Sequence, residues 1–297
     1  MIPVILFTYA RPNHLTKTLD SLKLNQVPLI YAFSDGPKSP QDIKSVEQVR
    51  KILDSVNWCE LCTFSHETNM GLGKSILKGV SEVFEIHDKA IIFEDDLICV
   101  PGTYEYLCKA LDYYENDSRV MSVTGWTHPK IIPRNIGDQP YFDGRAECWL
   151  WGSYAKYWKG MEKNAITLMS LCQAKGIDTY KYGKDLVRMA KLEDKLNIWA
   201  VRFLYLHILK NGLCLRPPWS MVEHKGFDNK ATNAIDGSIW SNPILKTCPP
   251  IPYNWPDPIE NPECSILHRN AFGGKPSHSL ILLEFLKDHI KKIIGRD

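Results

Sequence analysis

Three consecutive carboxylates interrupt an apolar segment in the first third of the chain. The apolar run of residues 90–93 stops at Glu94, Asp95 and Asp96, and apolar residues resume at 97–100. Adjacent like charges repel unless a cation compensates them, and Mg²⁺ or Mn²⁺ prefers oxygen ligands while keeping positions open for substrate phosphates. In open α/β sheets, ligands bind beyond the carboxyl ends of strands, where these acids would lie. The triplet predicts a divalent-metal site, and its alternative role is a solvated turn.

A second candidate for chemistry is a glycine-containing segment before a predicted helix. A Walker A loop needs a Gly five residues before its final Gly, and Thr68 occupies that position, so hydrolase chemistry of that type is not predicted. A helix N-terminus with glycines can still approach the diphosphate of a nucleotide-sugar. The alternative role is a loop closed by two glycines. The candidate contacts in this segment are Asn69, Gly71, Gly73, Lys74 and Ser75.

Polar residues also follow the first two predicted strands. Thr8, Tyr9 and Arg11 end the first strand, and Asp35 ends the second. Aspartate can accept a hydrogen bond from a uracil N–H or a ribose hydroxyl, and arginine can meet a phosphate. Turns favour Asp and Gly for their own reasons, so each residue alone indicates little. Together they are candidate contacts for a base and ribose.

Alternating strands and helices must position these residues. From residue 2 to about 126, short β-rich runs alternate with amphipathic stretches of helix length, which predicts a mostly parallel sheet covered by helices. This half is expected to bind the nucleotide. The strands are expected at 2–8, 28–33, 59–65, 89–94 and 119–124, and the helices at 13–23, 41–54, 72–87 and 102–115.

The composition changes after about residue 140. An aromatic stretch is followed by a helix-like segment at about 181–211, and the prolines between 243 and 262 indicate a surface arm or lid. Residues 277–294 have the pattern of an amphipathic helix that packs on the domain, the alternative being peripheral contact with a membrane. We therefore divide the chain into a nucleotide-sugar-binding half (1–126), an acceptor-binding and catalytic half of the same domain (127–242), and an arm with a helix (243–297).

Composition limits the class of protein. The chain has 297 residues, 44% hydrophobic and 24% charged, with a formal net charge of +2 that is too small to indicate nucleic-acid binding. Nine scattered cysteines form no disulfide framework, and the lone C-x-x-C of Cys59 and Cys62 lacks a second pair for zinc. Neither a signal peptide nor an apolar run of roughly 18 to 20 residues is found, so a cytoplasmic protein without a transmembrane segment is expected.

Taken in order, these motifs resemble the GT-A glycosyltransferases. Within them the sequence is similar to the N-acetylglucosaminyltransferase I group and to bacterial family-2-like sugar transferases. The resemblance extends to about residue 233. Besides the residues above, it is carried by residues 104–107 (YEYL), 120–126 (VMSVTGW), 149–152 (WLWG), 157–158 (YW) and 222–226 (VEHKG).

This resemblance implies a GT-A fold, in which a Rossmann-like, mostly parallel sheet is flanked by helices beside an aromatic-rich acceptor side. It implies that Asp96 ligates Mn²⁺ or Mg²⁺, with Asp95 contacting metal, ribose or sugar and Glu94 contacting ribose, sugar or the metal's ligands. His224 lies where related enzymes run a loop over the diphosphate, so it is a candidate for metal or phosphate, or a simple hydrogen-bonding residue. The ion would neutralise the charge that grows on the departing UDP.

The catalytic base is not where the resemblance places it. The N-acetylglucosaminyltransferase I group has an Asp in a W-D-D-W stretch, whereas residues 199–202 here read WAVR. Trp149 and Trp151 are candidates to stack on the acceptor sugar, or else to pack in the core. The substitutes for the base, by residue type, are Asp194, which we rank first, and Glu193 and Glu147.

The sequence therefore predicts a metal-dependent, inverting transferase that moves a sugar from a UDP-sugar donor to a carbohydrate acceptor in polysaccharide assembly. Two alternatives stay open. A sugar-nucleotide nucleotidyltransferase uses a similar sheet and carboxylate-bound Mg²⁺, but would normally carry a Gly-rich loop directly after the first strand, where this chain has residues 8–11 (TYAR). A non-catalytic sugar-binding relative is the other alternative, because the W-D-D-W carboxylate is missing.

Overall fold

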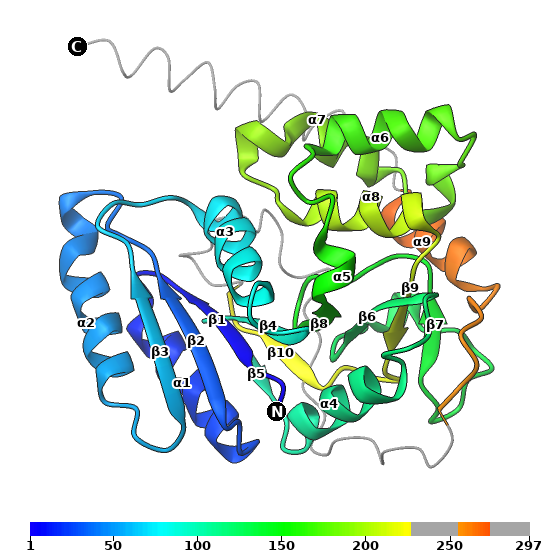
Figure 1. Cartoon of the computed structure of the whole chain (residues 1–297). Helices are drawn as coiled ribbons and strands as arrows, with labels where there is room; N and C mark the ends of the chain where they lie inside the picture. The colour runs from blue at the N-terminus through cyan, green and yellow to red at the C-terminus, as the bar shows by residue number, and fades with distance from the viewer. Residues whose placement is uncertain (227–254, 274–297) are drawn as a thin grey trace, which may run out of the picture.

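The computed structural model describes residues 1–226 and 255–273, and its centre is an eight-stranded sheet in the order β3-β2-β1-β4-β8-β6-β9-β7 (Figure 1). Strands β8 and β7 run antiparallel to their neighbours, and the other six share one direction. A second sheet pairs β10 with β5. The strands are β1 (Val4–Thr8), β2 (Leu29–Ser34), β3 (Glu60–Ser65), β4 (Lys89–Glu94), β5 (Leu97–Cys99), β6 (Val120–Thr124), β7 (Tyr141–Asp143), β8 (Trp151–Tyr154), β9 (Leu213–Arg216) and β10 (Val222–His224).

Helices flank this sheet, so the predicted class, α/β with a mostly parallel sheet covered by helices, is confirmed. The α-helices are α1 (Pro12–Leu24), α2 (Ile43–Asp54), α3 (Leu72–Phe84), α4 (Thr103–Tyr113), α5 (Ala155–Trp158), α6 (Ala165–Ala174), α7 (Asp185–Leu196), α8 (Ala200–Lys210) and α9 (Cys264–Phe272). The 3₁₀ turns are η1 (Pro40–Asp42), η2 (Pro129–Ile131) and η3 (Thr179–Tyr182).

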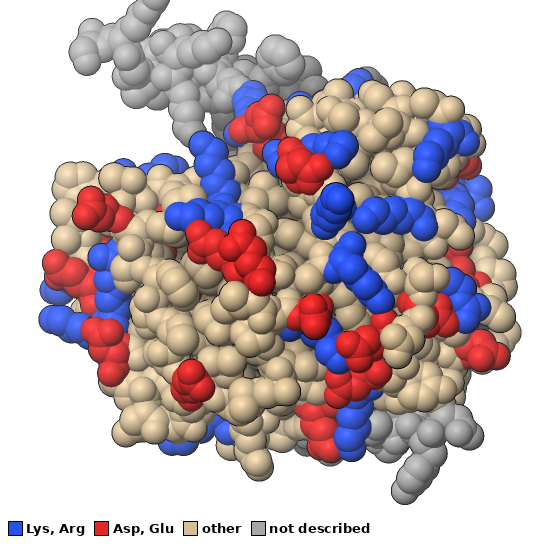
Figure 2. Space-filling model, viewed as in Figure 1, with Lys and Arg blue, Asp and Glu red and all other residues tan. Residues whose placement is uncertain are grey.

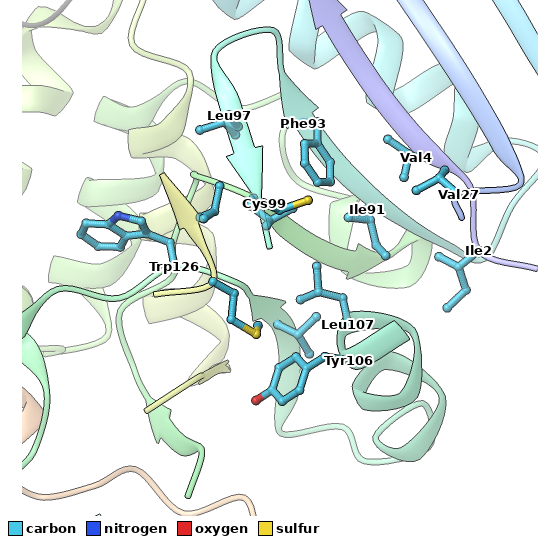
Figure 3. Packing of buried hydrophobic residues seen from close by; sticks show 14 of the residues in the cluster. Ile2, Val4, Val27, Ile91, Phe93, Leu97, Cys99, Tyr106, Leu107 and Trp126 are labelled. Carbon is cyan, nitrogen blue, oxygen red and sulfur yellow. The ribbon is translucent and has the colours of Figure 1, made fainter. Parts of the chain in front are cut away.

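Alternate strand residues point into two separate cores. Val4 and Leu6 of β1 belong to the core that includes side chains of α1, α2 and α4, part of which Figure 3 shows. Ile5 and Phe7 belong to the core that includes α3, α6 and α8. Because both faces of the sheet are covered, its central strands are continuous apolar runs instead of alternating ones.

The predictions for residues 2–126 are confirmed to within a few residues for all five strands and four helices. The helix-like segment expected at about 181–211 is two helices, because Asn197 adopts a left-handed conformation (φ 56°) that ends α7 before α8 begins. Strand β5 and strands β7 to β10 were not predicted, since runs of three or four residues carry no readable periodicity. Residues 243–254 of the proline-rich segment, and the segment 277–294, lie outside the described residues.

The described part of the proline-rich segment packs on the domain. Trp255 makes ring contacts with Tyr106, Tyr113 and Tyr114, and Glu260 forms a β-bridge with Phe142. Within residues 1–226 and 255–273, no helix is long and apolar enough to cross a membrane. Acidic and basic side chains are interspersed on the face shown in Figure 2.

An aromatic cluster joins β8 to α8 and α5. The Trp151 ring is fully buried and stacks on Trp158 and Trp199, with centroids 5.7 and 5.6 Å away. It also contacts Phe203 at 4.5 Å. Trp151 is therefore part of the core that holds the helical layer on the sheet.

Replacing this ring should destabilise the whole domain. We expect Trp151→Ala to lower the free energy of unfolding by about 3 to 5 kcal/mol, because it opens a large cavity under α8. Urea denaturation followed by circular dichroism measures this loss. Tyr180→Ala is the control, since Tyr180 is 53% exposed and its loss should change stability by about 0.5 kcal/mol or less. Equal effects of the two substitutions would contradict the core role of Trp151.

Candidate active site at the β4–β5 turn

The acidic triplet occupies the turn that links the two sheets. Glu94 ends β4, and Asp95 and Asp96 form the two-residue turn before β5. Strand β4 runs parallel to β1, so the turn lies beside Thr8 at the carboxyl edge of the main sheet, as predicted. Burial and the negative charge of Asp96 raise the pKa of Glu94 to about 8.

Arg11 compensates the charge of the turn. Its Nη2 donates to Asp95 Oδ1 at 2.5 Å, and its Nη1 donates to Asp96 Oδ2 at 2.6 Å. Asp95 and Asp96 are only 1% and 3% exposed. Burial works against the charge of Arg11, but the two carboxylates outweigh it and raise the pKa of the guanidinium. The residue proposed to meet phosphate is thus held on the carboxylates.

Asp95 has further anchors of its own. Its Oδ2 accepts a hydrogen bond from the backbone N–H of Tyr9 at 2.9 Å, and its backbone carbonyl accepts one from Thr18 Oγ1 at 2.9 Å. Thr18 is buried in α1 and was not singled out from sequence, because a Thr in a helix gives no signal of a contact 77 residues away. Asp95 is therefore fixed by β1 and α1.

Asp96 is the more open of the two carboxylates. Its buried Oδ1 receives no hydrogen bond from any described residue, and His224 Nε2 lies 3.6 Å away. A Cβ on Gly226 would lie 2.2 Å from Asp96 Oδ2, so only glycine fits beside this carboxylate. An oxygen without a hydrogen bond in a carboxylate pair suits a hard cation.

His224 reaches Asp96 because β10 pairs antiparallel with β5, opposite Leu97. Burial lowers the pKa of its ring, which favours the neutral form. Gly226 N–H donates to Nδ1 at 3.2 Å, so the neutral ring carries its proton on Nε2, the nitrogen that faces Asp96. In this arrangement Nε2 of His224 faces Asp96 Oδ1 across 3.6 Å, which is longer than a hydrogen bond, so Oδ1 still accepts none from the described residues.

The donor set fits a cation that is shared with a substrate. Within the described ranges, no group of three or more His, Cys, Asp or Glu side chains is arranged to hold a metal by itself. Mg²⁺ and similar ions are commonly bound by one or two carboxylates together with substrate phosphates and water. The turn is therefore suited to an ion that arrives with a diphosphate.

Asp35 organises the glycine segment. Its Oδ1 accepts from the backbone N–H groups of Gly36 and Met70, both at 2.9 Å, and its Oδ2 accepts from Gly71 at 3.0 Å. Asn69 Nδ2 donates to the Gly36 carbonyl at 2.9 Å. These bonds tie the loop before α3 to the end of β2, so Asp35 and Asn69 have structural partners in addition to any ligand.

The N-terminus of α3 has a cap from within the chain. With the Asn197 amide oriented so that its oxygen faces the helix, that oxygen accepts from Leu72 and Gly73 N–H at 3.2 and 3.1 Å. A Cβ on Gly73 would lie 3.0 Å from the Asn197 carbonyl oxygen. Lys74 is exposed and Ser75 is buried in the first turn. The Gly73 amide, a candidate contact for a diphosphate, and the neighbouring Leu72 amide are therefore already satisfied.

The two tryptophans predicted to contact the acceptor, Trp149 and Trp151, lie in different surroundings. Strand β8 runs antiparallel to β4, so the residues that precede β8 lie beside the acidic turn. The half-buried Trp149 ring has its centroid 4.6 Å from His224 and 4.9 Å from Trp126. Trp151 is fully buried in the core, where a sugar cannot reach it. The expectation that Trp151 contacts the acceptor is corrected, and Trp149 remains a candidate.

The three candidate bases have different surroundings. Glu193 is buried, pairs with Arg202 and accepts from Ala165 N–H at 2.6 Å. Asp194, the next residue, is exposed on α7. The side chain of Glu193 is thus held inside the helical layer, whereas that of Asp194 is open to solvent.

Glu147 belongs to a buried charge network. Its Oε1 accepts from Trp149 N–H at 3.3 Å and its Oε2 from Arg216 Nη1 at 3.2 Å. Arg216 Nε also donates to Asp143, which is held in turn by His268 of α9 at 2.7 Å. This network fixes the backbone that carries Trp149, and sequence reasoning did not find it because its members lie far apart in the chain.

The cap on α3 can be tested directly. We expect Asn197→Ala to lower the free energy of unfolding by about 1 kcal/mol, while Asn197→Asp keeps an acceptor at the helix N-terminus and loses less. Asn211→Ala is the matched control, since Asn211 ends α8 with φ 53° but caps no other described helix. Chemical denaturation measures all three, and equal losses for Asn197→Ala and Asn211→Ala would argue against the cap.

Comparison with known proteins finds no matching family model and no matching curated protein. Among solved structures, a mannosyltransferase from Pyrobaculum calidifontis in complex with GDP-Man and Mn²⁺ is 13% identical over 52% of this chain and 45% of its own, with a TM-score of 0.39. A UDP-glucose pyrophosphorylase without ligand is 11% identical over 79% of this chain and 98% of its own, at 0.38. The chain thus spans under half the length of that mannosyltransferase. Both TM-scores are below 0.5, so neither likeness assigns an activity to this chain.

Proposed function

We propose that this chain is a metal-dependent, inverting glycosyltransferase that transfers a sugar from a UDP-sugar to a carbohydrate hydroxyl. The observation that carries this proposal is the pair Asp95 and Asp96 at the carboxyl edge of the sheet, with Asp96 Oδ1 lacking a hydrogen bond from the described residues. A carboxylate so placed suits an ion that bridges to a donor diphosphate.

Each residue has a proposed role consistent with its contacts. Asp96 is the direct metal ligand, because Asp95 is bound by both Arg11 and the Tyr9 amide. The ion supplies electrostatic stabilisation of the charge on the leaving UDP. Asp35 Oδ2 accepts one described hydrogen bond and so retains acceptor capacity for ribose or uracil. Trp149 offers a ring to the acceptor beside His224.

The proposed base is Asp194. Glu193 is committed to Arg202 and the Ala165 amide, and Glu147 to Arg216 and the amides that follow it. Asp194 is the exposed carboxylate of the three, on the helix that ends at Asn197. A base must be accessible to an incoming acceptor hydroxyl, and the exposure of Asp194 leaves it open to one.

The first test is calorimetric titration of UDP, GDP, CMP and ATP, with and without Mn²⁺. We expect UDP to bind at least roughly tenfold more tightly with Mn²⁺, and Asp96→Asn to abolish this gain by removing the ligand charge. Asp112→Asn is the matched control, since Asp112 of α4 is an exposed acid that pairs with Lys89, outside the acidic turn. Binding of UDP that is indifferent to both Mn²⁺ and Asp96 would refute the metal-dependent donor site.

The second test addresses the reaction. With UDP-sugars and oligosaccharide acceptors, we expect Asp194→Asn to bind UDP normally and to transfer sugar at least roughly 100-fold more slowly, because the base is lost. Product analysis by NMR gives the anomeric configuration, which should be inverted. An unchanged rate would exclude Asp194 as the base. Formation of UDP-sugar from UTP and a sugar 1-phosphate would instead identify a nucleotidyltransferase.

A further inference from the structure

The two carboxylates of the turn need a positive charge even without a metal. Asp95 and Asp96 are adjacent in sequence and almost completely buried. Burying carboxylates costs several kcal/mol each unless a hydrogen-bonded cation offsets the loss of water. The side chain that meets both is Arg11, with one Nη on each carboxylate. A guanidinium is suited to this because its five donors point in fixed directions.

The two halves of this bridge are unequal. Asp95 keeps the Tyr9 amide at 2.9 Å if Arg11 moves, and the Thr18 hydroxyl holds its backbone. Asp96 accepts the Arg11 bond on Oδ2, while its Oδ1 accepts none from the described residues. Breaking the bond between Arg11 and Asp96 would therefore release one carboxylate and leave Asp95 in place.

Arg11 is also placed where it can move. Its side chain is 21% exposed, compared with 2% and 5% for the side chains of Asp95 and Asp96. It precedes the first turn of α1, which begins at Pro12, so the long side chain is not fixed within a helix. A cation bound to Asp96 would repel the nearby guanidinium, since like charges at short distance disfavour each other in a buried site.

We propose that Arg11 is the resident counter-ion of the acidic turn, and that a divalent cation competes with Arg11 for Asp96. Arg11 stays bound to Asp95 while the cation takes its place on Asp96. This inference rests on the proposed function, since it presupposes that Asp96 ligates the cation. Arg11 therefore stabilises the acidic turn in the metal-free protein. The strength of the Arg11–Asp96 bond sets the affinity of the turn for metal.

Arg11→Gln tests the competition without any activity assay. In EDTA we expect its melting temperature to fall by roughly 5 °C or more, because two buried carboxylates lose their counter-ion. Binding of Mn²⁺ in the presence of UDP, followed by the EPR signal of the free ion, should tighten by about tenfold. Mn²⁺ with UDP should accordingly raise the melting temperature of the variant more than that of the wild type.

Arg145→Gln is the matched control. Arg145 is a buried arginine whose side chain pairs with Asp185 of α7 at 2.7 and 3.0 Å instead of with the acidic turn. Its loss should lower the melting temperature equally in EDTA and in Mn²⁺ with UDP. Arg11→Lys serves if Arg11→Gln fails to fold. It keeps a charge but not the two-pronged geometry, so it should bind Mn²⁺ more tightly than the wild type and be less destabilised than Arg11→Gln.

The outcomes separate this inference from the proposed function. Suppose that the wild type binds Mn²⁺ with UDP, and that every Arg11 variant that folds binds Mn²⁺ no more tightly than the wild type. Competition by Arg11 is then refuted and the metal site stands. If the wild type shows no Mn²⁺-dependent UDP binding, the proposed function fails and the inference fails with it. Tighter Mn²⁺ binding with a lower melting temperature in EDTA supports the inference.

Discussion

The burial of two adjacent carboxylates is the constraint on which the rest of the site depends. Arg11 bridges Asp95 and Asp96 in the interior, and the backbone N–H of Tyr9 donates a further hydrogen bond to Asp95. This requirement brings the end of β1, the start of α1 and the end of β4 to one point. The parallel register of β1 and β4 does so without distorting either strand, since both strands end on the same edge of the sheet.

The second half of the chain completes the site through antiparallel strands. Strand β8 lies between β4 and β6, so the sheet is continuous across the proposed boundary at residue 126. Its direction places Trp149 next to the acidic turn, and the pairing of β10 with β5 places His224 there. The buried network of Glu147, Arg216 and Asp143 then fixes the loop that carries Trp149. A site built across both halves suits an enzyme that must hold two substrates.

The loop before α3 shows how internal hydrogen bonds limit what a motif can do. Asp35 and Asn197 together accept hydrogen bonds from the amides of Met70 to Gly73. Such amides at a helix N-terminus are in general an anion site, but here side chains of β2 and of the α7–α8 junction satisfy them. The amides of this loop are therefore satisfied from within the chain, and the proposed contact with a diphosphate is a cation held at the acidic turn.

The sequence by itself determined the elements of the first half and the position of the acidic triplet. Strand and helix patterns, glycine and proline signals and the position of the triplet are properties of neighbouring residues, so a local reading finds them. Tertiary structure decided the rest. Trp149 and Trp151 are two residues apart, yet one lies at the site and the other in the core. Arg11 meets Asp96 across 85 residues, and such pairings depend on strand order and direction, which local patterns do not specify.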